Sequence, residues 1–300
     1  MVCSCIGTQL VWADKTNSES IADTAMGTDC SVRVYGSDGT AKDIMDMLSD
    51  IENKYLSWRI EGSDIANINE NASESEPVMP SKWTYSYLEN VLDLARKSSG
   101  AFDPTLGRVS QLWNLESDNP YIPSKSELTE LLLETGWEKI NLGDGEVFLK
   151  DGVHIDLGAV GKGIGCDEAR KMLEEADADA AVVSVGGSIL TYGKKPDGKP
   201  WKIGIANPRN EDGESYLGSL TIDGTCSIST SGDYEKYVIE NDVRYHHILD
   251  PKTGYPADSG LISVTIVCEK GWLSDGLSTA CFVLGYEDSL PLLELSLIHI

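Results

Sequence analysis

Six strand-like segments follow one another near the C-terminal end of the chain, joined by turn-rich loops with no helix between them. They cover residues 201–206, 217–222, 226–230, 236–240, 244–249 and 261–268. Apolar residues at helical spacing predict helices at 41–56, 82–98, 125–136, 163–176 and 274–284. These elements lack the regular βαβ alternation that is typical of a parallel sheet. The order therefore predicts an α+β fold, with largely antiparallel mixed sheets and flanking helices.

The N-terminal segment differs in character from the rest of the chain. Residues 1–13 are mildly apolar but lack the basic start and the full apolar segment of a signal peptide, and residues 14–25 are polar. We expect residues 1–25 to be a disordered arm or the remnant of an export signal, and residues 26–300 to form one domain. No stretch is apolar enough to span a bilayer, so we expect no transmembrane segment.

The charge balance restricts the possible partners. Asp and Glu number 49 against 24 Lys and Arg, which gives a formal net charge of −25. Such a surface repels nucleic acid, so we expect no nucleic-acid partner. A polyphosphate ligand would need metal ions, backbone amides or helix N-termini to offset the repulsion. The seven cysteines form no CxxC pair and only four histidines are present, so a zinc site has little support.

Two glycine-containing segments have the composition of a ligand site. In GAFDPTLGRVSQLW (100–113), Asp103 precedes a proline and can present a carboxylate from a loop, although a plain Asp-Pro turn would give the same sequence. In HIDLGAVGKGIGCDEARKML (154–173), we expect a short strand, a glycine-spaced loop and a helix whose N-terminus faces phosphate, with Lys162 as a mobile cation. Residues alone leave this segment open between a phosphate site and a flexible turn. In a third segment, the glycine pair Gly186-Gly187 ends a buried strand, where a flat ring could lie on bare backbone.

The remaining two motifs carry a candidate base and candidate metal ligands. STSGDYEKYVIENDVRYHHILDPKTGYP (229–256) contains a polar turn at 231–233 and the pair His246-His247 before an Asp-Pro step. A histidine beside a carboxylate can activate a hydroxyl, although a histidine at the end of a strand is usually structural. In LSDGLSTACFVLG (273–285), Asp275 and Thr279 are four residues apart and project from one face of a helix. One carboxylate, one hydroxyl and phosphate oxygens suit Mg²⁺. The alternative is that Asp275 only complements the helix dipole.

These five segments, in this order, resemble the ApbE family of FAD:protein FMN transferases. The resemblance extends from AMGT (25–28) to FVLGYEDSLPLLE (282–294). It implies an ApbE-like, T-fold-like architecture, with residues 26–300 as a single flavin transferase catalytic domain. It also implies Mg²⁺ and FAD, with FMN transferred from FAD to a threonine hydroxyl of an acceptor flavoprotein and AMP released.

The resemblance also assigns residues. An FAD site would be lined by Met26, Trp58, Ala101, Phe102, Asp103, Asp156, Lys162 and Ile248. Magnesium would be held by the backbone carbonyl of Ala159 and the side chains of Asp275 and Thr279, and His247 would be the base. Trp58 stands where relatives often carry tyrosine, His246 where they commonly carry serine, and the ending LSLIHI departs from the family's closing strand.

Two other activities fit the same motifs. An FAD pyrophosphatase would release FMN and AMP through the same metal site, and a non-catalytic FAD-binding protein would use the same cavity. Family acceptors are often subunits of membrane redox complexes, so the resemblance implies an extracytoplasmic location, periplasmic or membrane-anchored through a missing signal. A cytoplasmic location stays open at this point.

Overall fold

A six-stranded antiparallel sheet organises the chain. The computed structural model describes residues 18–115, 117, 119–150, 152–210 and 215–295. The sheet has the order β1-β2-β5-β6-β9-β12, and every neighbouring pair is antiparallel. Its strands are β1 (Ser18–Ala25), β2 (Thr28–Tyr35), β5 (Ala180–Val185), β6 (Ser188–Gly193), β9 (Cys226–Gly232) and β12 (Ser263–Cys268). The prediction of an α+β fold with antiparallel pairing is confirmed.

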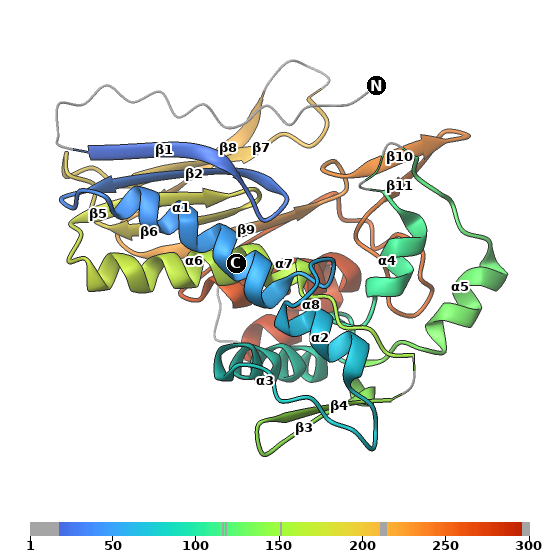
Figure 1. The fold of residues 1–300 in the computed structure, drawn as a ribbon. Helices are drawn as coiled ribbons and strands as arrows, with labels where there is room; N and C mark the ends of the chain where they lie inside the picture. The colour runs from blue at the N-terminus through green and yellow to red at the C-terminus, as the bar shows by residue number, and fades with distance from the viewer. Residues whose placement is uncertain (1–17, 116, 118, 151, 211–214, 296–300) are drawn as a thin grey trace.

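Three helices cover one face of this sheet, as Figure 1 shows: α1 (Thr40–Ile51), α6 (Gly158–Glu175) and α7 (Gly271–Leu284). The alternation of β5 explains the layers. Ala181 and Val183 pack in the cluster under the helices, while Val182 points to the opposite face. There it meets Trp201 of β7 (Trp201–Ala206), which pairs with β8 (Tyr216–Ile222). Both faces of the central strands are therefore buried.

A second group of elements packs against α6 and α7, below them in Figure 1, and builds a second apolar cluster with residues of these two helices. It contains the π-helix η1 (Glu52–Leu56), α2 (Asp64–Asn71), α3 (Lys82–Lys97), η2 (Trp137–Lys139), β3 (Ile140–Gly143), β4 (Glu146–Leu149) and α8 (Tyr286–Leu295). A third group holds α4 (Gly107–Trp113), α5 (Lys125–Leu132) and the hairpin of β10 (Tyr237–Glu240) and β11 (Val243–His246). Trp113 joins α4 to the hairpin, because the centre of its ring lies 5.5 Å from that of Tyr245 on β11.

Several sequence predictions need correction. Residues 18–25, expected within a disordered arm, form β1, because Ala25 is buried with Ile21 packed beside it; residues 1–17 lie outside the described part. The expected strand and glycine loop at 154–162 are absent, and α6 begins at Gly158, so the glycines belong to the helix. The last predicted helix begins at Gly271 rather than Ser274. Strand β6 and helix α8 were not predicted, and the ending at 296–300 is not described.

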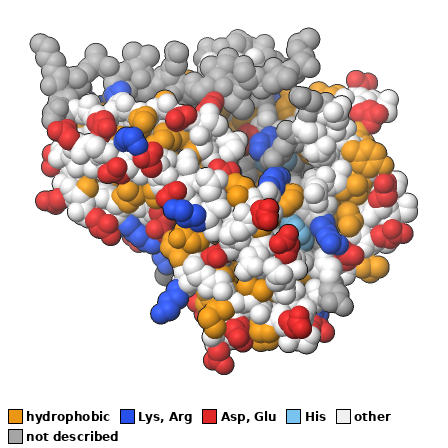
Figure 2. Space-filling view, in the orientation of Figure 1, with side chains coloured by type: hydrophobic (Ala, Val, Ile, Leu, Met, Phe, Trp, Pro, Cys, Tyr) orange, Lys and Arg blue, Asp and Glu red, His pale blue; other side chains and the backbone are white. Residues whose placement is uncertain are grey.

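Within the described residues, none of the helices combines the length and apolar character needed to cross a bilayer. Figure 2 shows acidic side chains spread over the surface, with several basic side chains and a histidine gathered at a hollow.

Candidate active site

A cavity of about 330 Å³ lies where the three groups of elements meet. Its wall is built from the β1–β2 turn, η1 and the residues after it, the segment 101–110, the first turns of α6, the end of β9 and the segment after it, the residues after β11, and α7. All twelve residues that the resemblance singled out line this one cavity: Met26, Trp58, Ala101, Phe102, Asp103, Asp156, Ala159, Lys162, His247, Ile248, Asp275 and Thr279. The structure therefore brings together residues spread over more than 250 positions of sequence.

The close crossing of α6 and α7 places the candidate metal ligands. A Cβ atom at Gly163 would lie 2.5 Å from the carbonyl carbon of Gly271 and 2.8 Å from Cβ of Asp275, so the two helices touch through their backbones. Asp167 of α6 fixes the start of α7, because its carboxylate accepts hydrogen bonds from the amides of Gly271 (2.6 Å) and Trp272 (2.9 Å). This explains one glycine of the segment in physical terms, because Gly163 permits the crossing.

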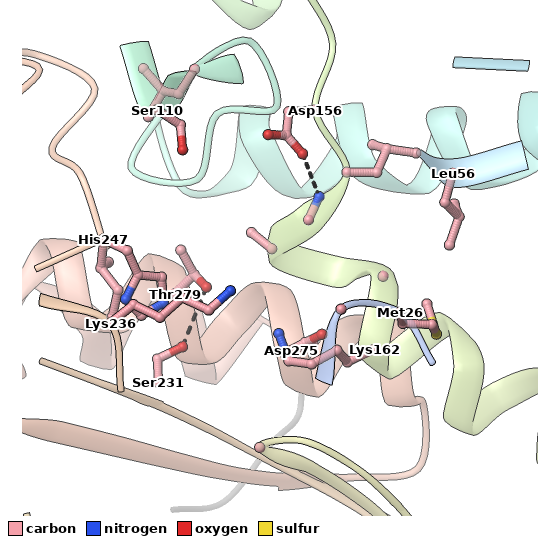
Figure 3. Close-up of a pocket in the computed structure, with 18 of the residues that line it drawn as sticks. Met26, Leu56, Ser110, Asp156, Lys162, Ser231, Lys236, His247, Asp275 and Thr279 are labelled. Atoms are coloured by element: carbon pink, nitrogen blue, oxygen red, sulfur yellow. Dashed lines mark hydrogen bonds between the residues drawn. The ribbon is translucent and has the colours of Figure 1, made fainter. Parts of the chain in front are cut away.

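Asp275 sits at that crossing and is almost fully buried, with 4% of its surface exposed. Its Oδ2 accepts a hydrogen bond from the amide of Gly163 at 2.9 Å. Burial raises the pKa of the Asp275 carboxyl, and the charge of Lys162 opposes that rise. Figure 3 shows Asp275 and Thr279 on the cavity side of α7, with Lys162 and Lys236 both extending toward them. A buried carboxylate beside cations is a typical feature of a functional site.

A group of hydroxyls continues from Asp275 along α7. The hydroxyl of Ser231, near the end of β9, lies 2.8 Å from the hydroxyl of Ser278 and 3.4 Å from that of Thr279 (Figure 3). Ala159 stands in the first turn of α6 on the same cavity. The three predicted donors are thus all oxygens, the type that Mg²⁺ prefers.

The donor set contains a single carboxylate. Across the described parts of the chain, no group of three or more His, Cys, Asp and Glu side chains could hold a metal by itself. The residues therefore fit a hard cation that takes part of its shell from substrate phosphate oxygens, and they do not fit zinc.

His247 follows directly after β11 and is held by its backbone, whose amide donates to the carbonyl of Lys236 at 3.1 Å. Its ring is buried, and Nδ1 has no hydrogen-bond partner among the described residues. Burial, followed by the charges of Lys236 and Lys162, lowers the pKa of His247 to about 3. The imidazole is consequently neutral at physiological pH, the state that a general base needs.

The β1–β2 turn and η1 form the opposite wall. Met26 adopts φ +53°, in the left-handed region, within a two-residue turn completed by Gly27 at φ +66°. The amide of Met26 donates to Oε2 of Glu52 at 2.7 Å, which anchors the turn to the π-helix. This arrangement brings Met26 to the cavity that Trp58 also lines.

Trp58 forms an aromatic surface of that wall. Its ring meets His154 edge-on at 5.1 Å, and the guanidinium of Arg59 lies 4.2 Å from its centre. Its indole Nε1 is buried without a hydrogen-bond partner among the described residues. A buried unpaired donor costs free energy, so its place in a cavity wall indicates a ligand acceptor.

Two predicted acids are engaged with backbone. Asp103 accepts from the amide and hydroxyl of Thr105 (2.9 and 2.6 Å) and from the amide of Trp137 (3.2 Å). Burial raises the pKa of the Asp103 carboxyl, and these hydrogen bonds oppose the rise. Asp156 accepts from the amide of Gly158 at 2.8 Å (Figure 3). Both carboxylates therefore shape the loops that border the cavity.

Sequence reasoning missed several lining residues, namely Glu52, Arg59, Ser110, Glu235 and Lys236. Lys236 is the most consequential, because its charge acts on His247. In the sequence, Lys236 is marked only by its position close to the polar turn at 231–233. No pattern in the residues around it indicates which side chain faces the cavity.

Comparison with known proteins places the chain. The sequence profile of the ApbE family matches residues 26–299. The FAD:protein FMN transferase of Treponema pallidum is 35% identical over 297 residues, covering 92% of this chain and 81% of the relative. That of Haemophilus influenzae is 32% identical over 295 residues, covering 93% and 84%.

Solved structures agree with the sequence relatives. An ApbE protein from Thermotoga maritima superposes with a TM-score of 0.84 at 34% identity, over 93% of this chain and 91% of that one. The flavin transferase ApbE from Vibrio cholerae gives a TM-score of 0.83 at 27% identity, over 94% and 92%.

Proposed function

The chain belongs to the ApbE family and is a flavin transferase that uses FAD, and on that premise we propose that it transfers FMN to a threonine hydroxyl of an acceptor flavoprotein with the help of Mg²⁺. The observation that carries the proposal is the convergence of a neutral, buried His247 with the oxygen donors Asp275 and Thr279 in one cavity. A general base beside a metal-and-phosphate site suits the attack of a hydroxyl on a pyrophosphate.

The chain's own groups prepare the pyrophosphate. The N-terminal turn of α6 borders the cavity at Gly158 and Ala159, so its amides and dipole favour phosphate oxygens. Lys162 and Lys236 add positive charge from two different elements. Mg²⁺, held by the Ala159 carbonyl, Asp275 and Thr279, would supply further neutralisation of the charge on the pyrophosphate oxygens.

His247 performs the proton transfer. Its neutral imidazole accepts the proton of the acceptor hydroxyl, and that oxygen attacks the phosphorus on the FMN side of FAD. The bond between this phosphorus and the bridging pyrophosphate oxygen breaks, so AMP leaves and the acceptor keeps FMN through a phosphoester. Lys236 and Lys162 stabilise the departing negative charge.

We also propose that the acceptor is a subunit of a membrane redox complex and that transfer takes place outside the cytoplasm. The family's usual acceptors support this extension. Fractionation of cells that express the tagged full-length protein tests it, since retention of the protein in the cytosolic fraction would contradict it.

The central experiment combines FAD, Mg²⁺ and a flavoprotein domain that carries FMN on a threonine. We expect a fluorescent flavin band on a denaturing gel and release of AMP. Free FMN without a labelled band would show an FAD pyrophosphatase instead, and tight FAD binding without turnover would show a binding protein.

Asp275→Asn tests the metal site in the same assay. The amide oxygen can still accept from Gly163, so the fold is kept while the charge is removed. We expect transfer to fall by about 10³-fold and the dependence on Mg²⁺ to weaken. Wild-type activity with Mg²⁺ in this variant would show that Asp275 is not a ligand.

A further inference from the structure

The β10–β11 hairpin stands apart from the central sheet, beside α4, as Figure 1 shows. It exposes three apolar side chains that lie outside the cavity wall: Tyr237 is 37% exposed, Ile239 57% and Val243 48%. A two-stranded hairpin is marginally stable alone, and exposed apolar edge strands usually carry charges that prevent pairing. β10 has only Glu240 as a charged residue.

The base of this hairpin, at Lys236 and His247, forms part of the wall of the cavity. The register pairs Tyr237 with His246, and the bond from the amide of His247 to the carbonyl of Lys236 extends the ladder by one pair. Lys236 and His247 both line the cavity. A segment lying along β10 would therefore run directly toward the candidate base.

The ladder also defines which backbone groups are available at the edge. Because Lys236 and His247 form a hydrogen-bonded pair, the next pair along, Tyr237 with His246, is a non-hydrogen-bonded pair. The backbone N–H and C=O groups of Tyr237 and Ile239 consequently point away from β11. Among the strands that the structure describes, β10 pairs with β11 alone.

The side chains of the same two residues lie on one face. Tyr237 and Ile239 share this face with Arg244, whose guanidinium lies 3.7 Å from the centre of the Tyr237 ring. The opposite face, with Tyr245, packs toward Trp113 of α4. His246, the partner of Tyr237, also lies on the first face and is buried against Phe282 (ring centres 5.4 Å apart). The hairpin is thus braced at its base and along the face of Tyr245, while Tyr237 and Ile239 stay exposed beside Arg244.

We propose that β10 is the docking edge for the acceptor protein, which adds an extended segment to this strand with its acceptor hydroxyl at the cavity end. The occupant follows from continuity with the site, because a protein hydroxyl must reach His247 and the edge leads there. Backbone bonds to Tyr237 and Ile239 would set the register, and their side chains would contact alternate residues of the acceptor. The inference rests on the proposed transfer to a protein hydroxyl.

Ile239→Lys tests the docking edge, with Leu217→Lys as the matched control. Leu217 is 67% exposed and lies on β8, a strand of another two-stranded sheet that lends no residue to the cavity. Each full-length variant is titrated with the flavoprotein domain at saturating FAD and Mg²⁺, and FAD binding and thermal unfolding are measured in parallel. We expect kcat/KM for the acceptor to fall at least about tenfold in Ile239→Lys alone, with FAD affinity unchanged.

A second probe examines the backbone bonds. A synthetic peptide spanning the acceptor threonine is compared with peptides N-methylated at one or the other alternating set of positions. We expect one set to abolish labelling by the wild-type enzyme and the other to leave it within about twofold.

Equal kcat/KM in Ile239→Lys and the wild type, an equal loss in Leu217→Lys, or equal labelling of both methylated sets would overturn the docking edge while leaving the transferase assignment intact. Absence of transfer by the wild-type enzyme, with FAD hydrolysed to free FMN, would instead refute the proposed function and the docking edge with it.

Discussion

Gly163→Ala should damage both stability and metal-dependent activity, because the α6–α7 crossing has no room for a methyl group. The added Cβ would lie 2.5 Å from the Gly271 carbonyl carbon and 2.8 Å from Cβ of Asp275, where ordinary contacts begin at 3.4 Å. The helices must therefore separate by about 1 Å, since backbone atoms cannot rotate away from the contact.

The expected magnitude follows from two opposing contributions. Overpacking costs about 3 kcal/mol, the upper part of its usual range, because the clash is with backbone. The higher helix propensity of alanine returns up to about 1 kcal/mol. A net loss near 2 kcal/mol corresponds to a fall in Tm of about 3–5 °C for a chain of this size.

The effect on activity should exceed the effect on stability. Separation of the helices breaks the 2.9 Å bond from Gly163 to Asp275 and moves Asp275 away from Ala159. A misplacement of about 1 Å costs on the order of 10²-fold in rate. We expect transfer to fall by that factor, with part of the loss recovered at high Mg²⁺ in a titration of FAD-dependent labelling.

Gly161→Ala is the stability control in the same helix. Its Cβ would meet Leu56 and Met26 at 3.7 Å, an ordinary contact, so Tm should hold or rise. Gly271→Ala, which approaches Gly163 from the other side, should reproduce the loss. A Gly163→Ala protein with wild-type Tm and wild-type Mg²⁺ dependence would refute the explanation of this glycine.

Three further predictions concern single side chains. The His247 pKa of about 3 lies below the 6.5 of the unfolded chain, so the unfolded state binds more protons between these values; the stability due to the neutral ring is present above pH 6.5 and is lost as pH falls toward 3. Urea unfolding between pH 5 and 8 should therefore show, below pH 6.5, a slope of up to about 1.4 kcal/mol per pH unit in the wild type that His247→Asn lacks, whereas identical slopes would contradict the burial of a neutral ring. Asp167→Ala removes the acceptor of two α7 amides and should cost about 1–3 kcal/mol in the same assay; an unchanged midpoint would show that water replaces the carboxylate. Trp58→Phe deletes an unpaired buried donor, so stability should change by less than about 0.5 kcal/mol while the Kd for FAD, measured by flavin fluorescence, rises about five- to tenfold; equal Kd values would show that Nε1 does not contact FAD.

The antiparallel pairing was the most predictable part of the fold, because a run of strands without helices leaves it as the simple solution. The glycine segment of α6 was misinterpreted for a physical reason. Gly163 looks the same in sequence whether it opens a phosphate loop or permits a helix crossing, and only the position of Gly271 decides. Strand β1 escaped prediction because most of its residues are exposed, so its polar composition matches that of a linker.

The candidate site was predictable as a set of motifs but not as a geometry. Asp275 and Thr279 follow from four-residue spacing on a helix, and the structure places them on the cavity side of α7. Lys236 could not be found in this way, because its importance comes from a single ladder bond to His247 across the hairpin. Contacts set by register are invisible until the pairing of the strands is known.

The charges around the cavity explain why a hard cation belongs to the proposed mechanism. Five carboxylates line it against three basic side chains, so the protein alone does not offset a pyrophosphate: Glu52, Asp103, Asp156, Glu235 and Asp275 face Arg59, Lys162 and Lys236. Hydrogen bonds from backbone amides occupy Asp103 and Asp156, and burial raises the pKa of Glu235. Asp275 is the carboxylate placed among hydroxyl oxygens. A divalent cation at that position would cancel the excess of two negative charges, five carboxylates less three cations, and this acidic chain could then hold its polyphosphate substrate.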